Sequence, residues 1–448
     1  MNGSFRGGVH PPDMKSLSRD LPLQEFLAKG DMVFPLSQHI GKPAKAVVKK
    51  NDPVLAGQLI AEADGFVSAN VYSSCSGKVK AVEKHRTISG QMLECIIIEN
   101  DGEYTQADTY DTRRDVDGMT VEEITAAVKD AGIVGLGGAG FPTHVKLMPK
   151  DSAAIRYVIV NGAECEPYIT CNDQLMRSNA DEIVEGTAIV LELFPNAEAV
   201  IAIEDNKPEA VAAMQQAVTK ARNARISVRA LHTKYPQGGE RSLITAIAGI
   251  DFPVASLPAD VGCIVDNVGT VYAIQRAVVY GEPLFKHVMT LTGEAVSHPG
   301  NYIIRDGTCV AELVEASGGV SDQLKKVLAG GPMMGFALTS LDVPVVKTTN
   351  AITMLAADPV EEAEKEMTAC LHCGRCTTVC PQGLLPQMMA DASEINDLDR
   401  YENKLYGLDC IACGSCTYIC PAKRPLTQIF KQTKAEILAI KRAAAGGK

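Results

Sequence analysis

The chain has 448 residues, a formal net charge of −11 and 46% hydrophobic residues, which predicts about two to four domains, each with its own core. The basic residues form no long cluster, which argues against an electrostatic nucleic-acid site as the main function. No apolar run is long enough to span a bilayer and the opening residues lack the apolar segment of a signal peptide, so we expect a cytosolic chain.

The first 110 residues predict a small all-β module. The segment KAVVKKNDPVLAGQLIAEADGFVSANVYSSCSGKVKAVEK alternates apolar positions with Asp-Pro, Gly and Ser turn residues. This pattern resembles the barrel-sandwich hybrid of lipoyl and biotin carriers, in which a modifiable lysine lies at a hairpin tip. The corresponding tip, YSSCSG at residues 72–77, contains no lysine. We therefore expect residues 1–110 to serve in docking rather than as a carrier.

Residues 118–285 predict a three-layer α/β domain. Val121, Ile124 and Val128 fall on one face of a helix that is expected to end at Gly132. Compact apolar runs such as AAIRYVIVNG then predict strands, and KPEAVAAMQQAVTKA predicts an amphipathic helix. Strands that alternate with helices in this way are typical of a sheet covered by helices.

Two more modules complete a multidomain α/β chain. The segment TLTGEAVSHPGNYIIRDGTCVAELVEASGG offers two short strands and a helix, which suits a β-grasp module of the SLBB type at residues 288–345. Beyond it, two cysteine-rich runs lie among helix-forming residues. We expect residues 358–448 to form a helical domain of the two-cluster ferredoxin type.

The two cysteine-rich runs share one spacing. The runs are ACLHCGRCTTVCP at residues 369–381 and DCIACGSCTYICP at residues 409–421. In each run, two, two and three residues separate four successive cysteines, and a proline follows the last. Together the runs hold eight of the fourteen cysteines. In two-cluster ferredoxins the last cysteine of each run binds the cluster of the other run. Zinc sites are the alternative, but zinc modules normally pair two cysteines with two more. The predicted ligands are Cys370, Cys373, Cys376 and Cys420 for one [4Fe-4S] cluster, and Cys410, Cys413, Cys416 and Cys380 for the second.

A glycine-rich segment, GLGGAG at residues 135–140, matches the dinucleotide pattern G-x-G-x-x-G. It follows a predicted helix rather than a strand, which argues against a Rossmann phosphate loop. The longer string GIVGLGGAGFPTHVKL closely resembles the flavin loop of the NADH-oxidising subunit of respiratory complex I and its relatives in bidirectional hydrogenases. Three further segments agree with that family in the same order: VNGAECEP, YPQGGERSL and NVGTVYAI.

The resemblance implies FMN at the glycine loop and NAD(H) beside it. Glycines would let backbone N–H groups approach FMN, and the next helix would offer its positive end and a lysine to the phosphate. Asparagines would bind flavin or ribityl oxygens, and carboxylates would hold the nicotinamide carboxamide and ribose hydroxyls, unless these acids are ordinary surface residues. The implied cofactor-binding residues are Gly135, Gly137, Gly138, Gly140, Phe141, Lys146, Asn161, Glu164, Glu166, Gly238, Glu240, Asn267 and Thr270.

Some positions depart from the complex I pattern. Relatives usually carry arginines where this chain has Val134 and Leu136, and a second carboxylate where it has Gly239. Complex I also places a single cluster after the flavin domain, whereas two clusters are predicted here. The contacts to FMN or NAD are therefore expected to be arranged differently.

The complete domain order, together with RGGVHPPDMK, PLSQHIG and GGPMMG, resembles the C subunit of the Rnf ion-translocating electron transport complex. The resemblance implies a peripheral subunit on the cytoplasmic side of the cell membrane, in a ferredoxin:NAD+ oxidoreductase coupled to Na+ or H+ transport. FMN would convert hydride transfer into one-electron transfer through the two clusters. The implied partners are integral membrane and ferredoxin-binding subunits and NADH or NAD+, without nucleic acid and without direct lipid binding.

Two alternatives stay open. A cobalamin reductase of bacterial microcompartments shares the flavin and cluster modules, but normally lacks the leading β module. A docking adapter with a decayed flavin site would only relay electrons. Bound FMN would argue against the adapter, and reduction of cob(III)alamin would favour the reductase.

Overall fold

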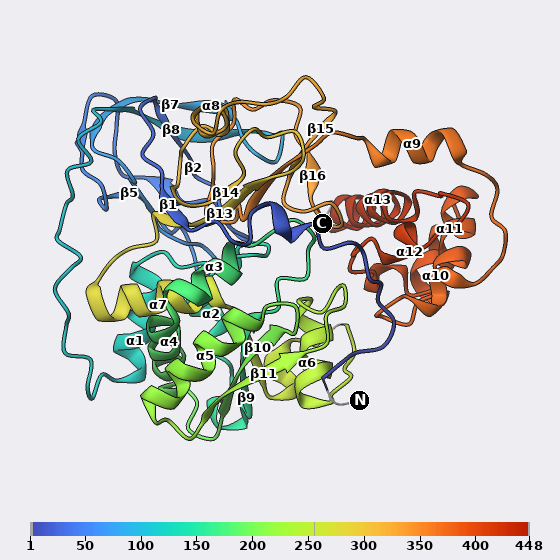
Figure 1. The fold of residues 1–448 in the computed structure, drawn as a ribbon, viewed down its shortest axis with the longest axis horizontal. Coiled ribbons are helices and arrows are strands. Elements are labelled where there is room, and N and C mark those ends of the chain that lie inside the picture. The colour runs from blue at the N-terminus through green and yellow to red at the C-terminus, as the bar shows by residue number, and fades with distance from the viewer. Residues whose placement is uncertain (1–2, 255, 447–448) are drawn as a thin grey trace.

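The computed structural model describes residues 3–254 and 256–446, which form an α/β domain and three further modules packed against it (Figure 1). The first β module and the β-grasp module lie together above this domain, and the cysteine-containing helical domain lies at one side. Within the described residues, no helix combines the length and the apolarity that crossing a bilayer requires. The fold class predicted from the sequence is confirmed.

The α/β domain is built on a four-stranded parallel sheet in the order β11-β10-β9-β12. Side chains alternate along each strand, so that Val158 and Val160 of β9 join one core and Ile159 joins another. The sheet is therefore buried on both faces, as parallel sheets generally are. Its strands are β9 (Tyr157–Gly162), β10 (Glu198–Glu204), β11 (Ile226–Leu231) and β12 (Cys263–Asn267).

Helices cover both faces of this sheet and make the domain three-layered. The first helix begins where a capping box at Thr120 satisfies its free N–H groups, and its buried face contains the predicted Ile124 and Val128. One face is covered by α1 (Val121–Asp130), α3 (Cys171–Ser178), α4 (Ala180–Glu192), α5 (Pro208–Ala221) and α7 (Val268–Tyr280), and the other by α6 (Glu240–Ala248). Because β10 and β12 lie on opposite sides of β9, the strand order reverses there, which is where ligands of such sheets bind.

The first β module is made of two small sheets around a shared core. Its predicted tip, residues 72–77, is not a free hairpin end, because Ser73, Ser74 and Cys75 are fully buried. Arg305 of the β-grasp module donates to the Ser74 carbonyl at 2.9 Å. The sheets consist of β2 (Met32–Pro35), β8 (Met92–Asn100), β7 (Gly77–Arg86) and β4 (Pro53–Val54), and of β3 (Lys45–Ala46), β5 (Leu59–Glu62) and β6 (Val71–Tyr72).

The sheet of the β-grasp module includes strands from outside residues 288–345. Its six-stranded sheet recruits β1 (Leu23–Glu25) from the start of the chain, paired in parallel with β14, and β17 (Ala351–Leu355) at its centre. These pairings could not be read from local patterns, because both strands are short and distant in sequence from their partners. The other elements are β13 (Lys286–Thr292), β14 (Gly300–Arg305), β15 (Lys326–Ala329), β16 (Phe336–Ala337) and α8 (Val310–Ala316).

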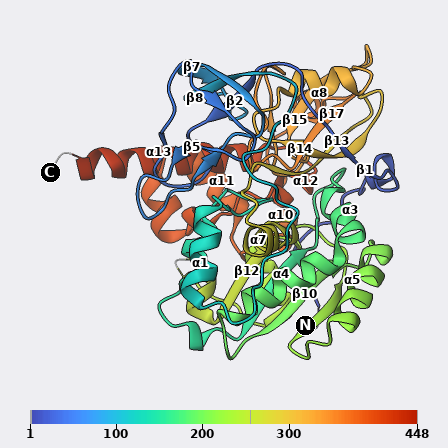
Figure 2. The same cartoon turned by 90° about the vertical axis from the view of Figure 1, so that its left-hand side faces the viewer.

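The C-terminal domain is helical and repeats one local structure. Each cysteine run passes through a glycine in the left-handed region, Gly374 with φ 72° and Gly414 with φ 87°, and continues into a four-residue helix. The last helix extends away from the rest of the molecule (Figure 2). The helices are α9 (Pro359–Glu366), α10 (Arg375–Thr378), α11 (Pro386–Glu394), α12 (Ser415–Tyr418) and α13 (Leu426–Gly446), with a π-helical turn at Arg400–Lys404. Short 3-10 turns occupy Lys15–Leu17, Ser152–Ala154, Pro258–Val261 and Gly407–Asp409.

Residues 3–22, which we name the N-terminal strap, lie along the carboxyl edge of the α/β sheet. The buried Lys15 amine donates to the carbonyl oxygens of Glu166, at 2.9 Å, and Ile169. Arg19 donates to the carbonyl oxygen of Asn206 at 2.8 Å, in the loop after β10. The strap therefore satisfies backbone acceptors that the parallel sheet leaves open at this edge.

A second buried lysine joins three modules. Lys347 follows the β-grasp strand β16, is 2% exposed, and donates to the carbonyl oxygens of Asn70 and Gly132, each at 2.7 Å. Asn70 belongs to the first β module and Gly132 to the α/β domain. Burial lowers the pKa of Lys347 to about 8, although the Asp306 carboxylate opposes the shift.

This pKa predicts a pH dependence of stability. Between about pH 8 and the ordinary lysine value of 10.5, the unfolded chain binds more protons at this position than the folded chain, so stability should rise with pH in that window. Between pH 7.5 and 9.5, the free energy of unfolding of the wild type should therefore rise by about 2 kcal/mol relative to that of Lys347→Met. The melting temperatures of the two proteins across this range measure the difference. Exposed Lys45, replaced by Met, controls for the loss of one positive charge. A wild-type-to-Lys347→Met difference that stays constant across this range would contradict the assignment.

Candidate flavin and iron-sulfur sites

The glycine loop, residues 135–140, lies where the strand order of the sheet reverses. Its backbone is held by the Leu136 N–H, which donates to the Thr270 hydroxyl on α7 at 2.9 Å, and by the Gly135 N–H, which donates to the Phe141 carbonyl at 2.9 Å. Gly137 has φ 72° and approaches the Asn267 amide so closely that an added Cβ would lie 3.1 Å from its Nδ2. The loop thus presents exposed backbone beside the carboxyl ends of β9 and β12, as the sequence predicts for a flavin loop.

The two predicted asparagines tie the loops of this edge together. Asn267 ends β12, caps α7 by accepting from the Gly269 N–H at 2.8 Å, and donates to the Asn161 carbonyl at 3.4 Å. Asn161 in turn donates to the Gly238 carbonyl at 2.9 Å. Most of their hydrogen-bonding capacity is therefore used within the protein, and the predicted contacts to flavin oxygens stay a prediction.

Lys146 forms an ion pair within the protein. Its helix, α2 (Thr143–Lys146), is a single turn, which is too short to offer a strong positive end. The amine donates to the Val265 carbonyl at 2.6 Å and to Asp266 Oδ1 at 3.0 Å. Burial opposes its charge, but the Asp266 carboxylate outweighs burial and raises the pKa of Lys146. The pair joins α2 to the end of β12, and the predicted contact of Lys146 with the FMN phosphate stays a prediction.

Glu240 completes this charged group. It is the first residue of α6, and its exposed side chain lies near Lys146 and Asp266. Burial of its carboxyl group raises the pKa of Glu240, while the Lys146 charge lowers it. Of the three predicted carboxylates, Glu240 is the one whose side chain stays accessible, although its carboxyl group lies in partly desolvated surroundings.

Glu164 has a structural role that the sequence did not reveal. With φ 50°, it turns back so that its carboxylate accepts from the Asn172 N–H at 2.7 Å and the Asp173 N–H at 3.3 Å, at the start of α3. Burial raises the pKa of Glu164, while Lys15 and Lys207 oppose the shift. Both carboxylate oxygens thus cap a helix, and the predicted contact of Glu164 with the nicotinamide stays a prediction.

Glu166 points toward the β-grasp module. Its carboxylate accepts from the N–H groups of Met333, at 3.1 Å, and Met334, at 2.7 Å, and glycine at position 331 leaves room for it. Burial raises the pKa of Glu166 to about 7. The segment GGPMMG thus binds the Glu166 carboxylate through two backbone N–H groups, and the predicted contact of Glu166 with NAD stays a prediction.

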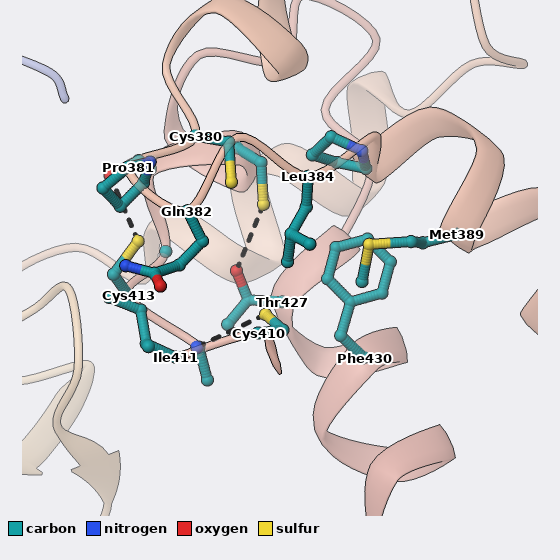
Figure 3. A pocket seen from close by; sticks show the side chains of 15 residues that line it. Cys380, Pro381, Gln382, Leu384, Met389, Cys410, Ile411, Cys413, Thr427 and Phe430 are labelled. Atoms are coloured by element: carbon teal, nitrogen blue, oxygen red, sulfur yellow. Dashed lines mark hydrogen bonds between the residues drawn. The ribbon is translucent and has the colours of Figure 1, made fainter. Parts of the chain in front are cut away.

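Four cysteines line one cavity in the helical domain, and we name Cys380, Cys410, Cys413 and Cys416 the proximal cysteine set. Figure 3 shows Cys380 and Cys413 on one side of this cavity and the apolar side chains of Met389 and Phe430 on another. Burial raises the pKa of the Cys410 thiol to about 11 and that of Cys416 to about 12. Thiolates at these positions would therefore need positive charge from a metal cluster.

The other four cysteines, Cys370, Cys373, Cys376 and Cys420, line a second cavity and are named the distal cysteine set. Cys373 is exposed, and the neighbouring Leu371 is 62% exposed. Each cavity thus combines three cysteines of one run with the last cysteine of the other, as the cross-ligation model predicts. No three metal-binding side chains in the described part of the chain converge on a point that one ion could occupy, whereas a cubane binds each thiolate at a separate iron.

The proximal cysteine set faces the α/β domain. Cys413 forms an apolar cluster with Val9 of the N-terminal strap and Tyr235 of the loop after β11. Cys165, Met333 and Val379 pack against this cluster, which we name the junction. The sequence prediction did not include Tyr235 or Val9 among the functional residues. The glycine pair in RGGVHPPDMK could have indicated a close backbone contact.

Comparison with family models gives the same domain order. Residues 3–103 match the RnfC barrel sandwich hybrid domain and residues 128–276 match the Nuo51 FMN-binding domain. Residues 288–337 match the SLBB domain and residues 363–421 match a 4Fe-4S dicluster domain.

Similar proteins and structures point the same way. The chain is 42% identical to the C subunit of the proton-translocating ferredoxin:NAD(+) oxidoreductase complex of Clostridium ljungdahlii, over 97% of this chain and 94% of that protein. It is also 42% identical to the C subunit of the Na(+)-translocating complex of Acetobacterium woodii, over 98% of each. A crystal structure of an air-oxidized NAD+-reducing [NiFe]-hydrogenase covers 70% of this chain and 63% of its own, with 20% identity and a TM-score of 0.50, which shows a shared fold alone. The chain therefore belongs to the RnfC family, which supplies the C subunit of ion-translocating ferredoxin:NAD(+) oxidoreductase complexes.

Proposed function

We propose that this chain is the NAD(H)- and FMN-binding iron-sulfur subunit of a membrane-bound ferredoxin:NAD+ oxidoreductase coupled to Na+ or H+ transport. The main support is that two sites lie at one edge of the sheet. The glycine loop lies at the end of β12, and the proximal cysteine set packs against the loop after β11. The named relatives move different ions, so either ion is consistent with it.

The alternatives are less well supported. A microcompartment cobalamin reductase normally lacks the leading β module, whereas residues 3–103 form one here and match the RnfC domain. A decayed adapter would not need a glycine in the left-handed conformation at position 137 or the contact between Leu136 and Thr270. These features support a retained flavin site.

Bound FMN and the two clusters would supply the redox chemistry, namely hydride exchange with the nicotinamide and single-electron transfer. The chain's own residues would shape the sites for that chemistry. The glycine loop leaves backbone N–H groups accessible to FMN, and Gly137 forms a cradle that a Cβ would fill. Phe141, next to the loop, is half-buried and would pack beside the ring.

Nicotinamide recognition would fall to the group around Glu240. Its carboxylate can accept hydrogen bonds from ribose hydroxyls, and the Lys146–Asp266 pair joins α2, which follows the glycine loop, to β12. Glu164 and Glu166 would act indirectly, by capping α3 and by holding the β-grasp loop. Glu240 would thus be the binding carboxylate, and the other residues would position the elements around it.

The two cysteine sets would hold the two [4Fe-4S] clusters. The proximal cysteine set is packed against the α/β domain, and the distal cysteine set includes the exposed Cys373. This order would direct electrons between the flavin side and the surface of the helical domain. The exposed Leu371 beside Cys373 would belong to the surface that faces a neighbouring protein of the complex.

Attachment to the membrane would be indirect, on the cytoplasmic side of the cell membrane. The chain is acidic, with a formal charge of −11, and the inner leaflet is anionic, so direct lipid binding is electrostatically unfavourable. The integral and ferredoxin-binding subunits of the complex would therefore provide the attachment.

Cluster ligation can be tested by composition. Anaerobic reconstitution should give about eight iron and eight sulfide per chain. Cys380→Ala should weaken or abolish the cluster bound by Cys410, Cys413 and Cys416, measured by iron content and EPR. Cys309→Ala removes a cysteine outside both sets and should keep both clusters. Loss of only the cluster bound by the distal cysteine set in Cys380→Ala would overturn the cross-ligation.

The flavin loop can be tested by a glycine substitution. Gly137→Ala introduces a Cβ at φ 72° and 3.1 Å from Asn267 Nδ2, so it should lower FMN affinity by about tenfold or more. Gly118→Ala has a similar φ of 79° in open space outside the loop and serves as the matched control. Fluorescence titration of the flavin-free protein measures both. Equal FMN affinity in the two variants would contradict the placement of FMN at this loop.

Membrane association should depend on partner proteins. Expressed alone, the chain should not sediment with protein-free vesicles made of anionic lipids, because it offers no net positive charge to the surface. Co-expressed with the integral subunits, it should sediment with membranes and be released with them by detergent. Binding of the purified chain to the vesicles would refute indirect attachment.

A further inference from the structure

Tyr235 connects the α/β domain to a predicted cluster ligand. It lies in the loop after β11, is 2% exposed, and donates its hydroxyl hydrogen to the Cys413 carbonyl at 2.7 Å. The two residues are 178 positions apart in the chain. The ring belongs to the apolar junction. The hydroxyl must be the donor in this hydrogen bond, because a carbonyl oxygen can only accept.

The backbone of Tyr235 is fixed by the N-terminal strap. Val9 and Tyr235 exchange two backbone hydrogen bonds, at 2.8 and 2.9 Å, as in a short antiparallel bridge. The preceding Gly8 donates to the Val379 carbonyl at 2.8 Å, next to Cys380. The strap therefore lies between the loop of Tyr235 and the run that contains Cys380.

The glycines of the strap are required by this close approach. At Gly7, with φ 74°, an added Cβ would lie 2.8 Å from the Cys380 carbonyl oxygen. At Gly8, with φ 86°, it would lie 2.7 Å from the Tyr235 carbonyl oxygen. Only a residue without a side chain fits at either position.

These contacts reach one cysteine set. Among the described residues, the hydrogen bonds from the α/β domain and the strap to the cysteine runs end at Cys413 and at Val379, beside Cys380. Both cysteines belong to the proximal cysteine set. In the distal cysteine set, the thiols of Cys370 and Cys376 make their hydrogen bonds within the helical domain.

Resting on the proposed function, we propose that Tyr235 is a positioning residue that fixes the cluster of the proximal cysteine set against the flavin domain and raises its reduction potential. Cluster potentials depend on net charge, on hydrogen bonds to the sulfurs and on solvent exposure. A hydroxyl donor at the carbonyl of a ligand acts on the first of these, because its dipole offsets the negative end of the carbonyl next to the cluster. The burial of Tyr235 prevents water from replacing the hydroxyl.

The test is a redox titration of the reconstituted full chain, followed by EPR. Tyr235→Phe removes only the hydroxyl and should shift one cluster to a more negative midpoint potential. At a fixed potential, its reduced-to-oxidised ratio should fall by up to about tenfold, which corresponds to about 59 mV for one electron. The other cluster should keep its potential.

Tyr302→Phe is the matched control. Tyr302 is also a buried tyrosine, 8% exposed, and its hydroxyl pairs with the Ser317 hydroxyl at 3.0 Å within the β-grasp module, away from both cysteine sets. Its replacement should leave both potentials close to the wild type. Equal potentials in Tyr235→Phe and the wild type, with both clusters present, would overturn the role of Tyr235 and leave the proposed function standing.

A second pair of variants covers the case in which Tyr235→Phe fails to assemble. Gly7→Ala presses on the Cys380 carbonyl and should disturb the same cluster, whereas Gly3→Ala has a similar φ of 78° and meets only Leu231 at 3.9 Å. A change at the distal cysteine set, or no change in Gly7→Ala, would refute the positioning role. A wild-type chain that binds fewer than two clusters would instead refute the proposed function.

Discussion

The four strands of the α/β sheet are parallel, so the loops that follow them lie at one edge of the sheet. The rest of the structure depends on how the backbone groups of these loops find hydrogen-bond partners. The strands cannot satisfy the backbone groups of the loops beyond their ends. Buried polar side chains do so instead: Lys15 binds two loop carbonyls, Lys207 binds the Ala163 carbonyl at 2.7 Å, and Glu164 caps a helix. The glycine loop and the proximal cysteine set are positioned by the same closed edge.

The first β module and the β-grasp module have no recognisable catalytic residues, but they help to hold this edge in place. The first β module and the β-grasp module meet the α/β domain at Lys347, which binds a carbonyl of each neighbour. Glu166 binds the GGPMMG loop, so that the β-grasp module also contacts the junction through Met333. The flavin loop and the cysteine sets are thus held in one arrangement by buried hydrogen bonds rather than by a continuous sheet.

Much of the site could be predicted from the sequence because its features are local. The cysteine spacing predicted which run completes which cavity. Thr270 contacts the glycine loop through the Leu136 N–H, while FMN binding at this loop stays a prediction. The partners that Glu164, Glu166 and Lys146 have within the protein could not be predicted, because these partners are distant in sequence or depend on a backbone with positive φ. The strap and strand β1 were also missed, since short segments acquire their structure from the surfaces they join.

We propose that this one chain links nicotinamide chemistry to iron-sulfur electron transfer across a fixed junction. The most direct measurement mixes the anaerobic protein, loaded with FMN and both clusters, with NADH and follows flavin absorbance and cluster EPR over time. Bleaching of the flavin together with the appearance of a reduced-cluster signal is expected, and flavin-free protein should show neither. Flavin bleaching without any cluster reduction, or equally fast cluster reduction without flavin, would contradict the claim.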